Sequence, residues 1–431
     1  MRILITGANG FIGSYITAEL LKNNYEVICC VRDVESTKKK FPTAEVIYCD
    51  FNIDLTPQSW INRLNNIDIV INVSGVLASS HANNIENVHV NGPKALFKAC
   101  TLTNVKRIIH ISALGIDDEK NTAYALTKKA TEAYLQKLEN IDWVILQPSL
   151  VYASGCYGGT SLFRGALATL PYFIPLIGDG LQQFQPIHID DLTKVIIHCI
   201  EREGKIHKLL KIVGPDIVTM KDILLGFRRW LGVNPGRLIK IPLIFIKIAA
   251  KLGDFLKIGP INSTAYNMLL QPNIADKKDF IDFTSIIPRN LQQGFATEPL
   301  TVQSIWHARL YFLKPVIKIV LGLFWIMTGI ISSIFAYDAS MQIIISLGFD
   351  KQIAPYILYG SCFTDIILGI LLIIKNKISR ICSLQILLIL AYTLLLTYLK
   401  PILWLDPLGP IFKNIPIILL TLVLMAIERD K

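Results

Sequence analysis

Short apolar runs separated by polar and glycine residues dominate the first half of the chain. Runs of this kind occupy residues 3–7, 26–31, 45–49, 67–72, 107–112 and 143–147, and helical periodicity fills the segments between them. Strands that alternate with helices predict right-handed crossovers and a parallel sheet covered on both faces. The pattern therefore predicts an α/β domain over residues 1–236, in which residues 155–236 form a smaller substrate lobe.

The last third of the chain has longer apolar runs. Four of them cover approximately residues 316–337, 355–374, 381–399 and 411–427. Each approaches the ~20 residues that an α-helix needs to cross about 30 Å of hydrocarbon. We therefore expect an all-α, four-helix transmembrane domain over residues 311–431.

An interrupted apolar segment lies between these two parts, within residues 237–310. Lys240, Lys247 and Lys251 line one side of a predicted helix whose other side is Ile, Phe, Leu and Ala. Such a helix lies in a bilayer interface more readily than it crosses one. The alternative is an ordinary amphipathic helix packed on the soluble domain. We expect an interfacial helix and a linker in this region.

Composition agrees with a membrane part and excludes intrinsic disorder. Hydrophobic residues make up 52% of the chain and charged residues 18%, whereas soluble proteins carry about 25% charged residues. The net charge of +10 comes with no arginine-rich stripe or aromatic-interleaved patch, so we expect no nucleic-acid partner. The cations lie beside apolar runs instead, as membrane-flanking residues do.

Loop charges predict the orientation of the spans in the cell membrane. The cations that flank the first span and that separate the second from the third are Arg309, Lys314, Lys318, Lys375, Lys377 and Arg380. Positive loops stay in the cytosol, so we expect a multi-pass protein with the N-terminal domain and the C-terminus cytoplasmic. Glycines follow the first short apolar run at once, which leaves no room for the apolar core of a cleavable signal peptide.

Cysteine and histidine spacing indicates neither a disulfide framework nor a metal site. None of the eight cysteines forms a C-x-x-C pair, and buried reduced thiols fit a cytosolic domain. His188, Asp190 and Asp191 are the nearest approach to a ligand cluster, but H-x-D-D has no recognised ligand spacing. We expect no metal and interpret these three as structural polar groups.

A glycine loop follows the first predicted strand and opens a helix. Gly7 permits a tight turn, Gly10 lets the backbone approach a pyrophosphate, and Gly13 lets the helix lie close to the sheet. The amides of the first helical turn would then face the phosphates. A glycine loop between a strand and a helix is the context that a dinucleotide-binding Rossmann domain requires.

The end of the second predicted strand bears on the choice of cofactor. An acidic residue there binds the ribose 2′-hydroxyl of NAD, whereas an arginine favours the 2′-phosphate of NADP. The chain has Arg32 followed by Asp33. Because Arg32 comes first we expect NADP, with NAD as the alternative.

A Tyr-x-x-x-Lys pair opens a later predicted helix. Tyr124 and Lys128 are four residues apart and so lie on one helical face. We expect Lys128 to stabilise the tyrosinate and to lower the pKa of Tyr124 from about 10, which would make the phenol an acid or base. Ser112 ends the fifth predicted strand and would orient a substrate oxygen beside the phenol.

These features together resemble an extended or atypical short-chain dehydrogenase/reductase of the NAD(P)-dependent epimerase/dehydratase type. The resemblance covers about residues 1–236 and depends on TGANGFIG (6–13), CDF (49–51), NVSG (72–75), HVNGPKALFKAC (89–100), HISALG (110–115), YALTK (124–128) and QPSLVYASG (147–155). FQPIHIDDL (184–192) is also similar to the branch that includes the NADPH-binding accessory subunit of respiratory complex I. The tail resembles a DoxX-like membrane domain through HARLYFLKP (307–315) and DPLGPIFKNIP (406–416).

The resemblance implies roles for individual residues. Ser112, Tyr124 and Lys128 would form the catalytic set, and Asn91 would support Lys128 through water. Asp50 would contact the adenine. The full cofactor-binding set would be Gly7, Asn9, Gly10, Phe11, Ile12, Gly13, Arg32, Asp50, Phe51, Ser74, Gly75, Tyr124, Lys128 and Pro148. Gln147 departs from the family pattern, which has an arginine before the Pro-Ser.

The function expected from the sequence is an NAD(P)-dependent oxidoreductase. It would act on a lipophilic carbonyl or quinone-like small molecule at the cytosolic membrane face, in contact with lipid. One alternative is a non-catalytic NADPH-binding sensor or membrane-complex subunit with an unidentified partner, and another is a nucleotide-sugar epimerase or dehydratase. Asp365 lies within the second apolar run, where a charge is costly, so it is a candidate functional residue or a carboxyl bonded to a neighbouring helix.

Overall fold

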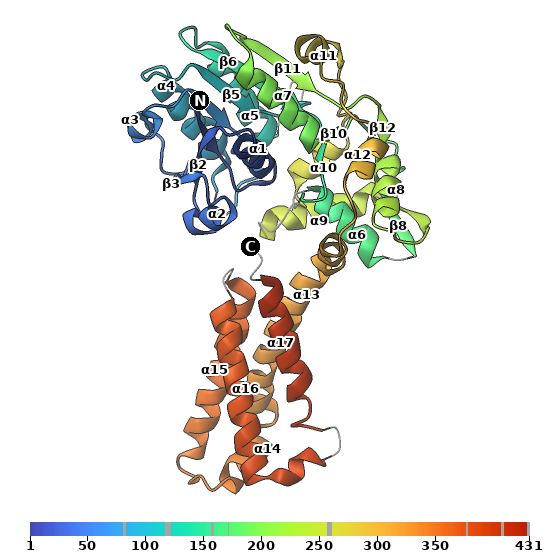
Figure 1. The fold of residues 1–431 in the computed structure, drawn as a ribbon. Helices are drawn as coiled ribbons and strands as arrows, with labels where there is room; N and C mark the ends of the chain where they lie inside the picture. Colours follow the sequence, from blue (N-terminus) through green and yellow to red (C-terminus); the bar gives the residue numbers. More distant parts are fainter. Residues whose placement is uncertain are drawn as a thin grey trace. The chain divides into compact units, whose positions relative to one another are not determined.

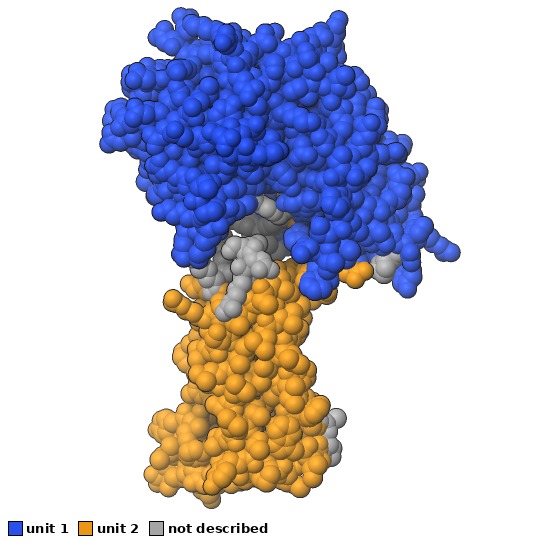
Figure 2. Space-filling model, in the orientation of Figure 1, with its two compact units in different colours: residues 1–308 blue, residues 309–431 orange. Residues whose placement is uncertain are grey.

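The protein consists of two compact units. The structure is a computed structural model and describes residues 1–80, 83–116, 122–156, 159–170, 172–256, 261–375, 378–406 and 409–428. Unit 1 comprises Met1–Ala308 and unit 2 comprises Arg309–Lys431, shown in blue and orange in Figure 2.

Unit 1 is built on a seven-stranded parallel sheet with the strand order β11-β6-β5-β4-β1-β2-β3. Its strands are β1 (Arg2–Thr6), β2 (Glu26–Val31), β3 (Glu45–Tyr48), β4 (Ile69–Asn72), β5 (Arg107–Ile111), β6 (Asp142–Pro148) and β11 (Lys208–Ile212). The predicted α/β Rossmann-type fold is confirmed. The edge strand β11 was not among the predicted strands, because its lysines interrupt the apolar run.

Helices cover both faces of this sheet, as Figure 1 shows. The helical segments of this part are α1 (Phe11–Lys22), α2 (Val34–Lys40), α3 (Gln58–Ile61), η1 (Asn62–Leu64), η2 (Asn87–Asn91), α4 (Gly92–Cys100), α5 (Ala123–Gln136) and α7 (Ile189–Glu201). Alternate residues of β1 divide between the two cores: Ile3 and Ile5 pack with α1 and α7, whereas Leu4 packs with α3, α4 and α5. The strand period of two places one set of side chains on each face.

A smaller lobe completes unit 1 beside the sheet. Its strands are β7 (Val151–Tyr152), β8 (Phe173–Ile177), β9 (Gln183–Phe184), β10 (Ile187–His188), β12 (Val218–Thr219) and β13 (Arg237–Ile241). Its helices are α6 (Gly159–Thr169), α8 (Met220–Trp230), α9 (Leu243–Leu256), α10 (Ser263–Leu269), α11 (Lys278–Thr284) and α12 (Leu291–Thr297).

The lobe extends further along the chain than residue 236, which the sequence suggested as its end. β13 pairs with β8 in parallel, and Leu291 and Phe295 of α12 pack against the lobe's apolar core. Phe280 of α11 is buried in the core under the sheet. Residues 237–308 are therefore part of unit 1 and not a linker, because their apolar side chains complete both cores.

Unit 2 is helical. Its helices are α13 (Val302–Ile330, which begins in unit 1), η3 (Ile331–Phe335), α14 (Tyr337–Ser346), α15 (Ala354–Ile374), α16 (Ser379–Leu399), η4 (Pro401–Trp404) and α17 (Asn414–Glu428). Three helices in the described part of the chain are long and apolar enough to cross a membrane: Val302–Phe335, Ala354–Ile374 and Ser379–Leu399. The fourth predicted span corresponds to α17, an apolar helix of 15 residues, whose length of about 22 Å is short of a full crossing. Lys377, one of the cations that predicted the orientation, lies outside the described residues, as does part of DPLGPIFKNIP.

Candidate functional site

The glycine loop between β1 and α1 has the geometry that its sequence predicted. Gly7 has a φ of +68°, a left-handed conformation that favours glycine. A Cβ on Gly13 would lie 2.1 Å from the carbonyl oxygen of Gly7, so no larger residue fits there. Gly10 is the N-cap of α1 and offers no side-chain cap, and Phe11, Ile12 and Gly13 form the first helical turn. This end of the helix is therefore available to an anionic group.

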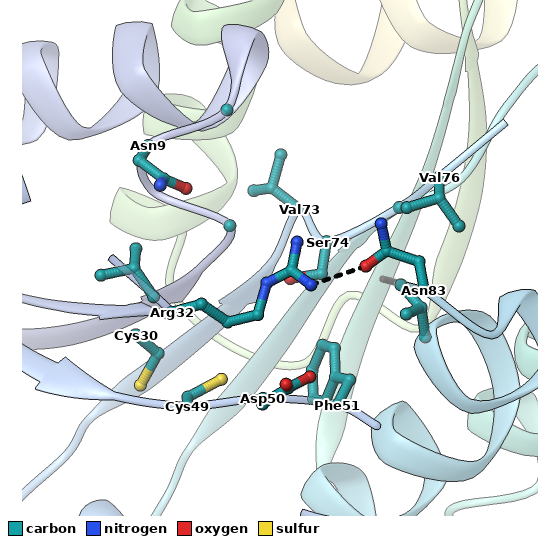
Figure 3. A pocket seen from close by; sticks show the side chains of 15 residues that line it. Asn9, Cys30, Arg32, Cys49, Asp50, Phe51, Val73, Ser74, Val76 and Asn83 are labelled. Atoms are coloured by element: carbon teal, nitrogen blue, oxygen red, sulfur yellow. Dashed lines mark hydrogen bonds between the residues drawn. The ribbon is translucent and has the colours of Figure 1, made fainter. Parts of the chain in front are cut away.

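A cleft opens at the carboxyl ends of β1, β2, β3 and β4, as Figure 3 shows. Eight of the residues proposed from the sequence line it: Gly7, Asn9, Gly10, Arg32, Asp50, Phe51, Ser74 and Gly75. The sequence did not single out the other lining residues, Cys30, Val31, Cys49, Val73, Val76, Asn83 and Val88. Ligands of open α/β sheets bind at this edge. The glycine loop, the open helix end and the mixed polar and apolar lining fit a dinucleotide.

The two residues after β2 have different roles. Asp33 caps α2, and its Oδ1 accepts a hydrogen bond of 3.1 Å from the backbone N–H of Ser36. Arg32 instead lines the cleft, where its Nη1 donates to Asn83 Oδ1 at 2.8 Å (Figure 3). The acidic residue is thus committed to a helix cap, while the guanidinium lies at the cleft.

Asp50 and Phe51 follow β3 at the floor of the cleft. Asp50 Oδ1 accepts from both the backbone N–H and the Nδ2 of Asn52 at 2.9 Å, which fixes the turn. The ring of Phe51 packs so closely on α4 that a Cβ on Gly92 would lie 2.5 Å from it. The adenine contact proposed for Asp50 is compatible with its place in the cleft lining.

Lys128 is buried beside the cleft. Its Nζ donates to the carbonyl oxygen of Ile111, the last residue of β5, at 3.0 Å. A Cβ on Gly75 would lie 3.4 Å from the same Nζ, so the ammonium group adjoins the cleft lining. Burial lowers the pKa of Lys128 to about 8, and Glu132 acts in the opposite direction.

Tyr124 is half-buried one helical turn before Lys128, and its ring packs edge-on against His89 with the centroids 5.4 Å apart. Burial raises the pKa of Tyr124 to about 12. The expectation that Lys128 lowers this pKa is therefore wrong for the structure. The reason is geometric, because the ammonium group is bonded to the Ile111 carbonyl and not to the phenol.

Ser112 follows β5 directly and is 5% exposed. Its Oγ has no hydrogen-bond partner among the described residues, although its backbone N–H donates to Leu146 at 2.8 Å. A buried hydroxyl without a partner is costly in an ordinary core. It is consistent with a group that bonds a ligand.

His89 joins the cleft to α5, and the sequence did not identify this role. Its Nε2 accepts from the backbone N–H of Val76 at 2.9 Å, and its Nδ1 lies 2.9 Å from Thr127 Oγ1. The hydroxyl of Thr127 donates to backbone carbonyls of its own helix, so Nδ1 of His89 carries the proton. Burial, and secondarily Lys128, lowers the pKa of His89 to about 3. The imidazole is therefore neutral and has both nitrogens engaged.

Asn91 does not reach Lys128. It lies exposed at the end of η2, where its Nδ2 donates to Asn87 Oδ1 at 2.9 Å. The π-helical turn of η2 places His89 inward instead. The water-mediated support proposed for Asn91 thus has no counterpart in its placement, and His89 is the residue of this motif beside Lys128.

Gln147 and Pro148 lie within the core at the end of β6. Gln147 is fully buried, and its Nε2 donates to both carboxylate oxygens of Glu132 at 3.0 and 3.1 Å. The carbonyl of Pro148 accepts from Leu114 at 3.0 Å, and Pro148 is not part of the cleft lining. Gln147 therefore holds the carboxylate of Glu132, which lies one helical turn after Lys128 on α5.

His188 at the end of β10, and Asp190 and Asp191 in the first turn of α7, are engaged with protein groups. His188 caps α7 and lies 3.2 Å from Glu298, while Asp191 forms a two-oxygen ion pair with Arg289. Arg289 also lies 3.4 Å from Asp190. This network ties the lobe to the residues before α13, in agreement with a structural role.

The sheet order, the glycine loop, the Ser that follows β5 and the Tyr and Lys on α5 define unit 1 as a Rossmann domain of the short-chain dehydrogenase/reductase type. Comparisons with known proteins agree. The NAD dependent epimerase/dehydratase family matches residues 3–212, and the DoxX-like family matches residues 322–422. The chain thus carries an epimerase/dehydratase-family domain followed by a DoxX-like membrane domain.

The chain is similar to proteins with several different functions. The photosystem II assembly factor Ycf39 of Guillardia theta is 25% identical over 258 residues, which is 60% of this chain and 78% of that protein. The mitochondrial NADH dehydrogenase (ubiquinone) 1 alpha subcomplex subunit 9 of Rattus norvegicus is 26% identical over 220 residues, or 49% of this chain and 56% of that subunit. The crystal structure of UDP-glucuronic acid 4-epimerase from Bacillus cereus with NAD matches with a TM-score of 0.55 at 21% identity. It covers 72% of this chain and 100% of that chain, and this likeness shows the fold.

Proposed function

We propose that the protein is an NADPH-dependent reductase of a lipophilic carbonyl or quinone-like compound, working at the cytosolic face of the cell membrane. The observation that carries the proposal is the buried Lys128 ammonium group, which adjoins the cleft lining and donates to the carbonyl oxygen of Ile111, the residue before Ser112. Lys128 adjoins Gly75 of the cleft lining, Tyr124 lies one turn away, and Ser112 has a buried hydroxyl without a partner. DoxX-like helices in the same chain favour a substrate that resides in the bilayer.

The residues of the cleft divide the work of holding the nucleotide. The open end of α1 holds the pyrophosphate, Asp50 and Phe51 border the adenine, and Arg32 faces the 2′-phosphate. Because Asp33 is committed to the cap of α2, the arrangement favours NADP over NAD. A bound nicotinamide cofactor supplies the hydride.

Tyr124 acts as the proton donor. Its pKa of about 12 keeps the phenol protonated in the resting protein, as reduction of a carbonyl requires. Ser112 donates a hydrogen bond to the same substrate oxygen, and the Lys128 ammonium provides a positive charge beside the cleft lining. His89 fixes the Val76 backbone and Thr127, which holds the cleft lining against the catalytic helix.

We also propose that α9 lies in the membrane interface. Its exposed side chains include Ile244, Phe245, Ile248, Leu252 and Phe255, the last 82% exposed. Lys247 and Lys251 border this apolar face, and Ala250 on another face is buried, whereas Lys240, which was predicted on the same helix, lies in β13. Exposure of the apolar face argues against the alternative of a helix packed on unit 1. Bilayer insertion would bring the substrate lobe to the lipid surface.

The proposal is tested with the full-length protein in liposomes, with NADPH outside and a short-chain benzoquinone in the bilayer. The expected result is saturable NADPH oxidation with one quinol formed per NADPH consumed. Two other results would contradict a reductase. Saturable NADPH binding without oxidation would favour a nucleotide-binding subunit, as the names of the curated relatives suggest. Hydrogen-isotope exchange into a nucleotide sugar without net cofactor consumption would favour an epimerase.

A further inference from the structure

The interior of unit 2 contains two apolar clusters on successive levels of the helix bundle. The first cluster consists of Leu321, Leu372, Ile378, Cys382 and Leu424. The second consists of Trp325, Leu368 and Ile389, with Ile417 packed against it. Each cluster contains residues of at least three of the helices α13, α15, α16 and α17. The clusters therefore show which residues of these helices lie at the same depth in the bundle.

Glycines set the register between α13 and α15. A Cβ on Gly369 would lie 2.5 Å from the carbonyl oxygen of Gly322, and a Cβ on Gly329 would lie 2.6 Å from that of Cys362. Small residues at such crossings let two membrane helices pack backbone to backbone. The helices are held at a close, defined separation at two points two turns apart.

Polar side chains occupy the space between these contacts. Trp325 lies between Gly322 and Gly329 on the same face of α13, at a spacing of three and four residues. Asp365 has the corresponding place on α15, between Cys362 and Gly369. The indole Nε1 of Trp325 and the Oδ1 of Asp365 are buried without a hydrogen-bond partner among the described residues.

Gln385 contributes two more unpartnered atoms from α16. It lies on the helix face between Cys382 of the first cluster and Ile389 of the second, and it is fully buried. Neither its Nε2 nor its Oε1 has a partner among the described residues. Thr421, also fully buried, lies at the same level of α17, between Ile417 and Leu424.

Three helices therefore direct unpartnered polar groups into one stretch of an otherwise apolar interior. An unpaired amide or indole N–H is costly in such surroundings, and membrane helices retain polar groups there chiefly for function. The indole can only donate, whereas the glutamine amide both donates and accepts. A ligand that satisfies them must present an acceptor oxygen, and the flanking Leu and Ile side chains require that the rest of it be apolar.

We propose that Trp325 and Gln385, on the helices that flank Asp365, form a binding site, within the membrane bundle, for the oxygen-bearing head of a lipid-soluble ring carbonyl compound such as a quinone. Carbonyl oxygens of the head accept from Trp325 Nε1 and Gln385 Nε2. This site is separate from the nucleotide cleft and does not depend on catalysis there, so binding is measured without NADPH.

The test uses the full-length protein in detergent micelles, with decyl-substituted benzoquinone as the probe in an equilibrium binding titration. Gln385→Leu removes both amide atoms at similar volume, and Trp325→Phe removes only the N–H. Each should weaken binding by about tenfold, the usual effect of one hydrogen bond from a buried group. Ser383→Ala is the matched control, because Ser383 is exposed on the same helix and its hydroxyl donates to the backbone carbonyl of Ser379.

Thermal unfolding and NADPH binding of the same variants separate a ligand site from a structural contact. Gln385→Leu should retain NADPH binding and unfold at the same temperature or higher, because it removes an unpartnered amide from an apolar core. Two results would overturn the proposal: no saturable binding of the quinone to the wild-type protein, or wild-type affinity in both Gln385→Leu and Trp325→Phe.

Discussion

At the scale of single residues, the roles of the adjacent side chains Arg32 and Asp33 can be assigned only when the fold is known. The sequence left the cofactor open between NADP and NAD because both residue types stand at the right place. The structure assigns Asp33 to the cap of α2 and leaves Arg32 at the cleft. The sequence predicts a helix in this segment but not its first residue, so it does not show that Asp33 is the N-cap.

Replacing Arg32 should therefore shift cofactor preference. Arg32→Ala removes a charged donor facing the 2′-phosphate, and we expect NADPH affinity to fall by about 10- to 100-fold with little change for NADH. Asp33→Ala is the control, since it should cost about 1 kcal/mol of stability as a lost N-cap without changing preference. Equal losses for NADPH and NADH in Arg32→Ala would contradict the assignment.

Lys128 predicts the pH dependence of both activity and stability. Its pKa is lowered to about 8 by burial, and only the protonated form places a positive charge beside the cleft lining, so kcat/KM should fall as pH rises through about 8. The unfolded chain keeps this proton up to about pH 10.4. Between these values the unfolded state binds more protons, so this residue makes stability rise with pH from about 8 to about 10.

Lys128→Met should abolish both effects, whereas Lys129→Met, at an exposed neighbouring position, should preserve them. Rate measurements and denaturant unfolding across pH 7 to about 10.5 check the prediction. An activity that increases through this range would show that neutral Lys128 is the working form.

At the scale of elements, sequence reasoning succeeded where the physical constraint is local. Gly7 and Gly13 were identified because a left-handed turn and a close helix approach each demand glycine. His89 was missed because its role depends on contacts with Val76 and Thr127, which lie in other elements. Asn91 was favoured by motif matching, yet the π-helical turn of η2 directs it to the surface.

The interfacial role of α9 is tested with spin labels on introduced cysteines, because all eight native cysteines are buried. Ile248→Cys on the apolar face and Leu102→Cys after α4 are matched in exposure, at 56% and 57%. In liposomes of phosphatidylcholine and phosphatidylglycerol, the label at 248 should be relaxed mainly by oxygen and the label at 102 by a water-soluble nickel complex. Predominant relaxation of both labels by the nickel complex would contradict membrane insertion, and shielding of the label at 248 from both agents would indicate a protein contact instead.

At the scale of the whole molecule, hydropathy distinguished the membrane domain from the N-terminal domain. The C-terminal limit of unit 1, in contrast, could be determined only from the structure. Residues 237–308 form short amphipathic elements. Their apolar side chains pack against cores formed by segments distant in the sequence, so their place in unit 1 cannot be predicted from local patterns. The length of α17 could not be predicted from the sequence either, because an apolar run does not show at which residue its helix begins.

Orientation follows from loop charge and is testable on intact cells. The first span enters from unit 1, so the turn before α15, which contains Lys351, should face outward. A membrane-impermeant thiol reagent should label Lys351→Cys directly and Leu102→Cys only after permeabilisation. The reverse pattern would place the nucleotide domain outside the cell and contradict the proposed site of action.

The most direct test of the central claim replaces the proposed proton donor. Tyr124→Phe should lower turnover of NADPH and quinone by about 10²- to 10⁴-fold, because it removes general acid catalysis, while NADPH affinity stays close to that of the wild type. Tyr134→Phe, a half-buried tyrosine on the same helix, should retain full activity. Wild-type turnover in Tyr124→Phe would contradict the account.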